Sequence, residues 1–213
     1  MKSHFASVSE AGGREEHQDR VACAEGIWAL ADGLGGHGAG ALAAEAAVTA
    51  VLGDRAGWRT HVNQDVQETG GRSTLVVLEL DGDQARWSHI GDSRLYHLRA
   101  GAIAAQTRDH SVPQMLVDAG ELAPQAVRGH EDRNRLLRSL GTAMPPKFAC
   151  GAAVVEAGDG FLLVSDGFWE LVTEEQMIEA FRRAESPGVW LELMRPAEPS
   201  DNWSAIAIVI AKE

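Results

Sequence analysis

Cysteine is scarce in this chain of 213 residues, which contains only Cys23 and Cys150. The two lie far apart among apolar or small neighbours, and their spacing matches no redox or metal motif. The sequence therefore argues against a fold held together by disulfides and against a catalytic cysteine. We predict that both side chains are buried and reduced.

Long apolar runs are also missing. No stretch approaches the ~18 consecutive apolar residues of a membrane-spanning helix, and residues 1–20 lack the apolar core of a signal peptide. These absences predict a cytoplasmic protein with no membrane partner.

Basic residues are outnumbered, because 19 Lys and Arg stand against 31 Asp and Glu, for a formal net charge of −12. This balance argues against nucleic acid as a partner. An anionic substrate would have to be attracted by local cations. The remaining composition, 45% hydrophobic and 23% charged, is typical of one globular domain with a sizeable core, and we expect a single domain over residues 1–213 and a monomer.

Short apolar segments joined by tight turns predict a mainly antiparallel sheet structure with some helices, hence an α+β fold. An Asp-Gly turn at Asp81-Gly82 predicts a hairpin of 73–80 with 85–90. Helices are expected over 41–52, from Ser111 to 118, over 174–184, and from Pro187. The segment 54–72 is interpreted as polar and irregular, with two short helical turns. Further strands are expected at 3–9, 21–24, 27–31, 94–99, 102–107, 147–155, 161–165 and, buried on both faces, 205–210.

Four aspartates occupy comparable places at the ends of apolar segments. Asp32 follows Ile27 to Ala31, Asp92 follows 85–91, Asp166 follows 161–165, and Asp201 precedes the last apolar run. Strand ends meet at one edge of a sheet, so these carboxylates are expected to cluster. Clustered like charges repel and raise each other's pKa unless cations neutralise them, and the pattern therefore predicts a metal site.

The glycine turn after Asp32 has a competing interpretation. Residues 33–38 satisfy G-x-G-x-x-G between a strand and a helix, and Asp54 lies where a ribose-binding acid is expected, so a dinucleotide-binding protein is an alternative. Two observations weaken it. Asp32 would place a carboxylate beside a pyrophosphate, and the later pattern is not the strand and helix alternation of a doubly wound sheet.

The segment 108–146 carries no strand signal and separates two strands. A long polar insertion of this kind is more often a lid or binding flap than part of the packed layers. A surface excursion without a function is the alternative.

Taken in order, these motifs resemble the bacterial branch of the metal-dependent serine/threonine protein phosphatases, the PPM family or type 2C. The resemblance runs nearly end to end and includes Thr107 to Ser111 and Arg138 to Gly141 as borders of a flap. Its motifs are Arg14 with Gln18-Asp19, Ala31 to His37, Gly91 to Arg94, Ser165 to Gly167, and Asp201-Asn202.

The resemblance implies two antiparallel β-sheets packed as a sandwich between helices, in α-β-β-α layers, with two Mn²⁺ or Mg²⁺ ions at one end. Asp32 would bridge both ions and the Gly33 carbonyl would bind one. Asp166 and Asp201 would hold the other, and Asp19 would act at the first ion, largely through water. Asp92 with Asp166 would form a third, weaker site, and Arg14 would clamp the substrate phosphate.

These residue types suit the chemistry, because hard divalent cations prefer oxygen ligands and a guanidinium matches phosphate with two parallel hydrogen bonds. The implied activity is hydrolysis of phosphoserine and phosphothreonine in proteins by a metal-activated water, with a serine/threonine kinase acting in opposition. The implied catalytic residues are Asp32, Asp166 and Asp201. A catalytically inactive binding or scaffold module is the alternative within the same family.

Four residues and one segment bear on how close the resemblance is. His17 stands where the bacterial motif has asparagine, and Leu34 is apolar as in bacterial members, so neither removes a metal ligand. His37 and His130 are interpreted as structural histidines. The 54–72 segment is shorter than the family's second helix, which leaves one flank of the sandwich without a predicted cover.

Overall fold

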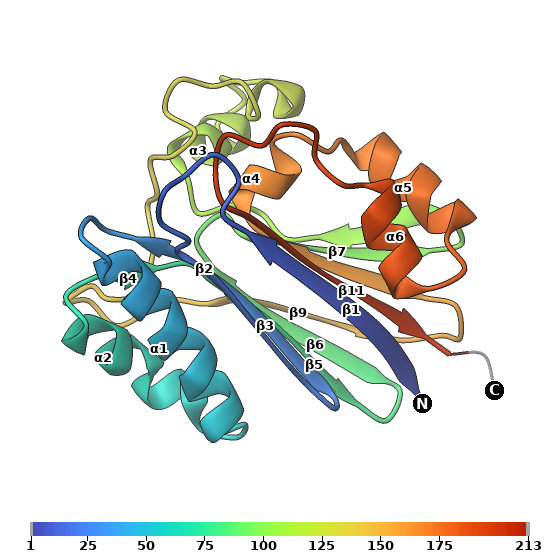
Figure 1. The fold of residues 1–213 in the computed structure, drawn as a ribbon, viewed down its shortest axis with the longest axis horizontal. Helices are drawn as coiled ribbons and strands as arrows, with labels where there is room; N and C mark the ends of the chain where they lie inside the picture. Colours follow the sequence, from blue (N-terminus) through green and yellow to red (C-terminus); the bar gives the residue numbers. More distant parts are fainter. Residues whose placement is uncertain (1, 212–213) are drawn as a thin grey trace.

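Two antiparallel β-sheets lie face to face at the centre of the computed structural model, which describes residues 2–211 (Figure 1). The first sheet contains, in spatial order, β1 (Ser3–Glu10), β11 (Trp203–Ile210), β10 (Gly160–Val164), β7 (Arg94–Arg99) and β8 (Ala102–Gln106). The second contains β2 (Asp19–Ala24), β3 (Ile27–Leu34), β5 (Leu75–Asp81), β6 (Gln84–Ile90) and β9 (Ala149–Val154), and the short β4 (Arg72–Ser73) pairs with β3.

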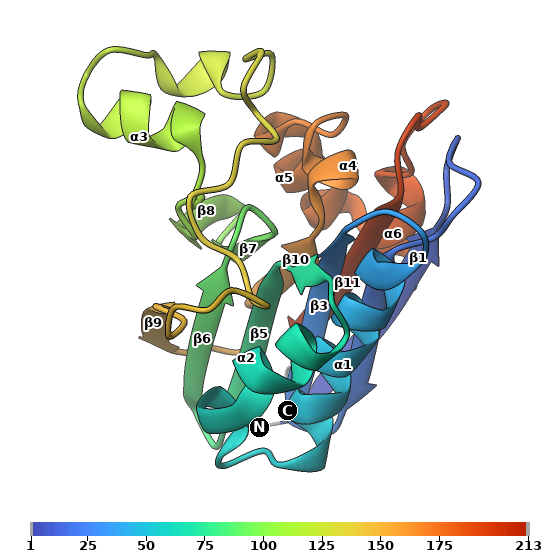
Figure 2. The ribbon, with the colours of Figure 1, turned by 90° about the vertical axis from the view of Figure 1, so that its left-hand side faces the viewer.

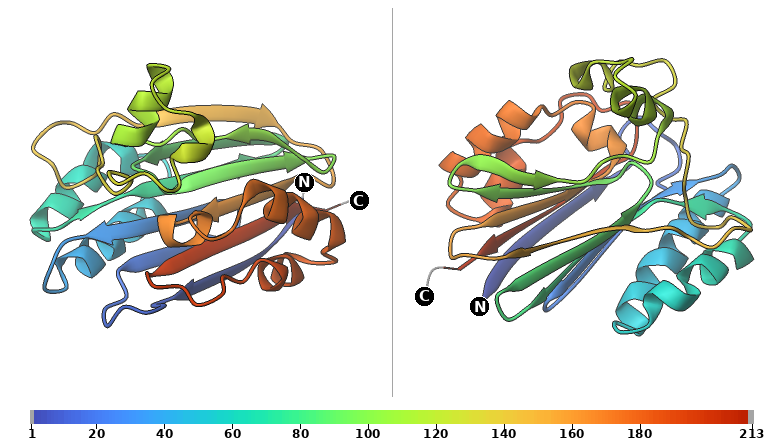
Figure 3. Two further views of the ribbon diagram at one scale, coloured as in Figure 1. Left: turned by 90° about the horizontal axis from the view of Figure 1, so that it is seen from above. Right: turned by 180° about the vertical axis from the view of Figure 1, so that it is seen from behind.

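Helices cover the outer face of each sheet, which gives the predicted α-β-β-α layers (Figure 3). Against the second sheet pack α1 (Ala39–Gly53) and α2 (Trp58–Glu68). Against the first pack α4 (Asp166–Trp169), α5 (Glu174–Arg183) and α6 (Pro187–Leu193). Among residues 2–211, no helix combines the length and the apolar composition that a membrane crossing requires.

The core between the sheets comes from alternate residues of their central strands. Trp28 and Leu30 of β3 belong to the same buried cluster as Phe161, Ile206 and Ile208 of the facing sheet. Side chains alternate between the faces of a strand, and the intervening residues of β3 and β11 are buried under the helices. The last strand is therefore buried on both faces, as predicted.

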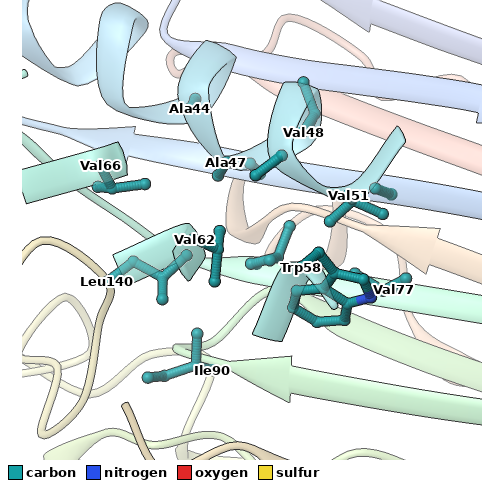
Figure 4. Close-up of a cluster of buried hydrophobic side chains, with 14 of the residues drawn as sticks. Ala44, Ala47, Val48, Val51, Trp58, Val62, Val66, Val77, Ile90 and Leu140 are labelled. Atoms are coloured by element: carbon teal, nitrogen blue, oxygen red, sulfur yellow. The ribbon is translucent and has the colours of Figure 1, made fainter. Parts of the chain in front are cut away.

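Residues 54–72 were predicted to be irregular with two short helical turns, but they contain one regular helix, α2, of 11 residues. Trp58, Val62 and Val66 recur at intervals of four and are fully buried against α1 and the second sheet (Figure 4). Every other position of α2 is partly or fully exposed, and the polar majority hides the apolar stripe. This helix supplies the cover that the sequence left open on that flank.

The remaining helical predictions are confirmed with small shifts of their ends. The Ser111 side chain accepts a hydrogen bond from the Gln114 amide at the start of α3 (Val112–Asp118). Thr173 and Gln176 form the expected reciprocal capping box of α5. The prediction that both cysteines are buried was wrong, since Cys23 is half-buried and Cys150 is exposed.

The segment between β8 and β9 stands above the ends of the sheets (Figure 2). It contains α3 and one 3₁₀ turn, Pro124–Ala126. Two isolated antiparallel bridges tie it down, Ser73 with Leu140 and Ser111 with Leu136. The second of these is internal to the segment, so the first holds its far end to the rim of the second sheet.

Candidate metal centre and phosphate pocket

Asp32 is held rigidly within β3. Asp32 lies opposite Asp19 of β2 in the strand pairing, and its backbone amide donates a hydrogen bond to the Thr74 hydroxyl at 3.0 Å. Its carbonyl accepts from the Thr74 amide at 2.9 Å and from the Ser73 hydroxyl at 3.0 Å. The strand continues two residues beyond Asp32 because Gly33 and Leu34 pair with β4, so the carboxylate projects from inside the strand and not from the following turn.

Gly33 follows Asp32 because no side chain fits there. A Cβ atom at Gly33 would lie 2.0 Å from the Gly40 carbonyl oxygen and 2.9 Å from that of Gln18. The turn beyond it ends at Gly38, which adopts φ 77° at the start of α1. Gly33 thus allows the backbone at Asp32 to pass close to the backbone of Gly40 and Gln18.

The strand pairing excludes the dinucleotide-binding alternative. Every strand pair that the structure describes in residues 2–211 is antiparallel. A Rossmann site requires parallel strands joined through the helix that follows the glycine turn. Here α1 leads instead into α2, and the next long strand, β5, returns antiparallel to β3.

Asp92 lies in the turn between β6 and β7 and is 4% exposed. Its carbonyl accepts a hydrogen bond from the Trp169 indole at 3.0 Å. The Arg94 guanidinium stacks on the same indole at 3.6 Å from the ring centroid and pairs with the buried Asp109 at 2.7 Å. This buried layer fixes the turn that carries Asp92.

Asp166 opens α4 at the end of β10, and its Oδ1 accepts from the Gly167 amide at 2.6 Å. The preceding Ser165 donates its hydroxyl to Asp19 Oδ2 at 2.8 Å. The other oxygen of Asp19, Oδ1, is buried and has no hydrogen-bond partner in the part of the chain that the structure describes. A buried carboxylate oxygen without a donor is costly, so Asp19 is suited to a ligand supplied from outside the chain.

Asp201 lies directly before β11 and faces Arg14 in the β1–β2 loop, at 2.6 Å. Asn202 holds that loop in place. Its side-chain amide donates to the carbonyls of Ala11 and Glu16, both at 2.9 Å, and its Oδ1 accepts from the Gln18 amide at 2.8 Å. Asn202 thus positions the chain on both sides of Arg14.

These elements enclose one pocket of about 750 Å³. The structure brings together Arg14 and five of the six predicted metal-binding residues, while the buried Asp19 lies behind the pocket wall. Pocket-lining residues that sequence reasoning did not assign include Gly71, Arg72, Asn134 and Leu136. The predicted site residues in the lining are Arg14, Asp32, Gly33, Asp92, Asp166 and Asp201.

The carboxylates lie near enough to repel one another. Burial raises the pKa of Asp32 well above its usual value, and the charges of Asp166, Asp19, Asp92 and Asp201 raise it further. Burial, followed by the charges of Asp19, Glu170 and Asp201, raises the pKa of Asp166 to about 7. A bound cation would reverse these effects.

The side chains are not arranged as a finished coordination sphere. Within residues 2–211, no three His, Cys, Asp or Glu side chains form a group that could hold a metal ion as they stand. Asp201 faces Arg14, and Asp166 and Asp19 accept protein hydrogen bonds. The donor set of carboxylates and one carbonyl nevertheless fits Mg²⁺ or Mn²⁺, and the unpartnered oxygen of Asp19 points to the same fit.

Comparison with known proteins identifies the family. No family model matches the chain. The "Serine/threonine protein phosphatase PstP" of Mycobacterium tuberculosis is 32% identical over 97% of this chain, which spans 44% of that protein's length. The "Protein phosphatase PhpP" of Streptococcus pneumoniae is 33% identical over 70% of this chain and 69% of its own length. The chain belongs to the PPM family of serine/threonine protein phosphatases.

The fold agrees with that of a solved PPM phosphatase. The catalytic domain of PstP in complex with two manganese ions superposes with a TM-score of 0.80 and 28% identity, covering 99% of both chains. The fold predicted from the sequence is therefore confirmed for this PPM chain. The curated mycobacterial relative is more than twice as long, so the match concerns the catalytic domain.

Several residues that shape the site were not assigned from the sequence. Thr74 holds the backbone of Asp32, and Trp169 holds the carbonyl of Asp92. Asn202 was part of a recognised motif, but its role as a clamp of the Arg14 loop depends on contacts across more than 180 residues of chain. No local pattern reveals partners so far apart in sequence.

Proposed function

We propose that this chain is a metal-dependent phosphatase that removes phosphate from phosphoserine and phosphothreonine in proteins. The observation that carries the proposal is the enclosure of Arg14, Asp32, Asp92, Asp166 and Asp201 in one pocket. Membership of the PPM family and the two manganese ions of the similar PstP domain support it. A manganese or magnesium pair is the proposed cofactor.

The ligands we propose are those given by the resemblance. Asp32, the Gly33 carbonyl, Asp166 and Asp201 would hold the two ions, and Asp19 would contribute largely through water. Asp92 with Asp166 would offer a third, weaker site. Bound divalent ions would supply an activated water nucleophile and Lewis-acid stabilisation of the phosphoryl oxygens. Both carboxylates already accept a hydrogen bond, Asp201 from Arg14 and Asp166 from the Gly167 amide.

The protein's own contribution is binding and positioning. Arg14 is half exposed at the pocket mouth, where its planar guanidinium can donate two parallel hydrogen bonds to phosphate oxygens. The net charge of −12 repels phosphoproteins in general, so this local cation and the metal ions must supply the attraction. Thr74 accepts a hydrogen bond from the backbone of Asp32, and Asn202 holds the loop that carries Arg14.

The decisive experiment is hydrolysis of p-nitrophenyl phosphate and of a phosphothreonine peptide with Mn²⁺, Mg²⁺ or chelator. Wild type is expected to turn over both substrates only with metal, and Asp166→Asn is expected to lose at least about 100-fold in kcat. Asp83→Asn, at the exposed hairpin turn, removes one charge away from the pocket and is the matched control. A folded wild type that binds the peptide but never turns it over would establish the scaffold alternative.

We also propose a cellular setting. A bacterial protein of this type would act as a cytoplasmic monomer against a serine/threonine kinase, with residues 108–146 serving as a flap at the pocket rim. Leu136 of that segment already lines the pocket. Phosphoproteomics of a deletion strain, with light scattering of the purified chain, tests the kinase opposition and the oligomeric state separately.

A further inference from the structure

A second cavity opens beside the catalytic pocket, at the foot of the 108–146 segment. Its volume is about 350 Å³. Arg72 and Leu136 line both cavities, so the two lie side by side. We call this second cavity the side groove; its main lining residues are Arg72, Ile90, Leu137, Arg138, Met144 and Lys147.

The side groove is positively charged in a strongly acidic protein. Arg72, Arg138 and Lys147 are exposed, no Asp or Glu lines the groove, and within residues 2–211 none of the three side chains has an ion-pair or hydrogen-bond partner. The other cations of the 108–146 segment are neutralised. Carboxylates pair with Arg108, Arg128, Arg133 and Arg135.

Apolar side chains stand exposed between these cations. Met144 is 69% exposed and Leu137 is 52% exposed. Leu140, only three residues after Leu137, is fully buried. The groove thus offers contact area for an apolar side chain, flanked by cations.

We propose that the side groove binds the polypeptide next to the phosphorylated residue and selects segments that carry carboxylates beside an apolar side chain. This inference rests on the proposed function, because it assumes that a phosphate occupies the Arg14 pocket. An extended chain advances about 3.3 Å per residue, so the few residues beside the phosphoresidue would extend from one cavity into the next. Charge complementarity commits the groove to an acidic partner, since no counter-charge lines it.

The test uses one variant, two peptides and one small substrate. The variant Arg138→Glu/Lys147→Glu reverses two groove charges and leaves Arg14 and Arg72, which line the catalytic pocket, untouched. The control Arg86→Glu/Arg183→Glu makes the same change of net charge at exposed cations outside both cavities. The peptides carry the same phosphothreonine with either Asp and Glu or Lys and Arg as neighbours.

Wild type and the control are expected to prefer the acidic peptide in kcat/KM. The groove variant should lose about tenfold on the acidic peptide and gain on the basic one, because an attraction becomes a repulsion at two sites. Its turnover of p-nitrophenyl phosphate should be unchanged, since that substrate does not reach the groove. Equal use of both peptides by wild type, or equal losses in the control and the groove variant, would overturn the proposal.

A failure of the proposed function gives a different result. If wild type hydrolyses neither p-nitrophenyl phosphate nor peptide with any metal, the phosphatase proposal fails. Fluorescence anisotropy of the labelled peptides then tests the groove alone. If wild type binds the acidic peptide more tightly and Arg138→Glu/Lys147→Glu loses this preference, the side groove is supported as a peptide-binding site. Equal binding of both peptides would reject that role.

Discussion

The guanidinium of Arg14 donates a hydrogen bond to the carboxylate of Asp201 at 2.6 Å, across 187 residues of sequence. The expected phosphate clamp and an expected metal ligand thus form an ion pair on the pocket wall. Their side chains are 58% and 36% exposed. Because exposed ion pairs contribute little to stability, this contact can exchange for a phosphate and a cation at low cost.

Substitution of Arg14 is therefore expected to affect substrate binding more than turnover. Arg14→Ala removes a charge-assisted hydrogen bond to phosphate, and the KM for a phosphopeptide should rise by about 10-fold or more while kcat falls less. Steady-state kinetics at saturating Mn²⁺ provide the measurement. Arg14→Lys keeps the charge without the bidentate geometry, so its KM should lie between those of wild type and Arg14→Ala. An unchanged KM in Arg14→Ala would reject the clamp.

Neutralising the half-buried carboxylate of Asp166 is expected to separate metal affinity from folding. Burial, followed by the charges of Asp19, Glu170 and Asp201, raises the pKa of Asp166. Asp166→Asn therefore removes a charge that the folded protein disfavours, and it should unfold in chelator at the same temperature as wild type or higher. Saturating Mn²⁺ should raise the wild-type melting temperature, because a ligand at 100 times its Kd stabilises by about 2.7 kcal/mol. Asp166→Asn should lose most of that rise.

The control for this experiment is Asp83→Asn, which lies in the β5–β6 turn. Saturating Mn²⁺ should raise the melting temperature of Asp83→Asn as much as that of wild type. A marked fall of the Asp166→Asn melting temperature in chelator would show that this carboxylate is needed for folding.

The buried pair of Arg94 and Asp109 is expected to matter for stability. Their side chains are 8% and 2% exposed and are joined by two hydrogen bonds of 2.8 and 2.7 Å. Arg94→Met leaves the Asp109 carboxylate buried and unpaired, which should cost about 3–5 kcal/mol in the free energy of unfolding. Urea denaturation measures that loss.

The double variant Arg94→Met/Asp109→Leu provides the control, because it removes both charges and should recover much of the loss. Equal instability of the single and double variants would indicate that the Arg94 stacking on Trp169, and not the ion pair, stabilises this layer.

The α+β class and the gathering of four aspartates could be predicted because they depend on short-range patterns, whereas the order of the layers came from the family resemblance. Asp32 follows an apolar run, and Asp166 opens a helix after a buried strand. The helix α2 was not predicted because only three of its 11 residues, Trp58, Val62 and Val66, are apolar, and the polar majority masks their regular spacing. Tertiary packing, not propensity, decides a segment of this kind.

Contacts between residues far apart in sequence could not be predicted, for a different reason. Nothing near Arg94 in sequence indicates that Asp109 neutralises it or that Trp169 stacks on it. Likewise, Cys150 lies in a small-residue strand that reads as buried, but β9 is the edge strand of its sheet and exposes alternate residues. Edge or central position is a property of topology, which a local pattern does not encode.

A stacked pair of histidines predicts how stability depends on pH. The rings of His89 and His110 lie 4.7 Å apart and nearly parallel, and His110 Nδ1 accepts from the Gly91 amide at 3.1 Å. Burial, followed by the charges of His89 and Arg138, lowers the pKa of His110 to about 4. Burial also lowers the pKa of His89.

The sign follows from proton linkage. The unfolded chain binds a proton on His110 near pH 6.5, but the folded protein does so only near pH 4, so stability is full above pH 6.5 and falls as the pH drops through that window. Since His110 is partly exposed, solvent screening limits its share to on the order of 1 kcal/mol. His110→Asn should flatten the dependence of the unfolding free energy between pH 6.5 and 4, whereas His4→Asn at an exposed position should leave it unchanged. Identical slopes in wild type and His110→Asn, measured by urea denaturation, would contradict this role.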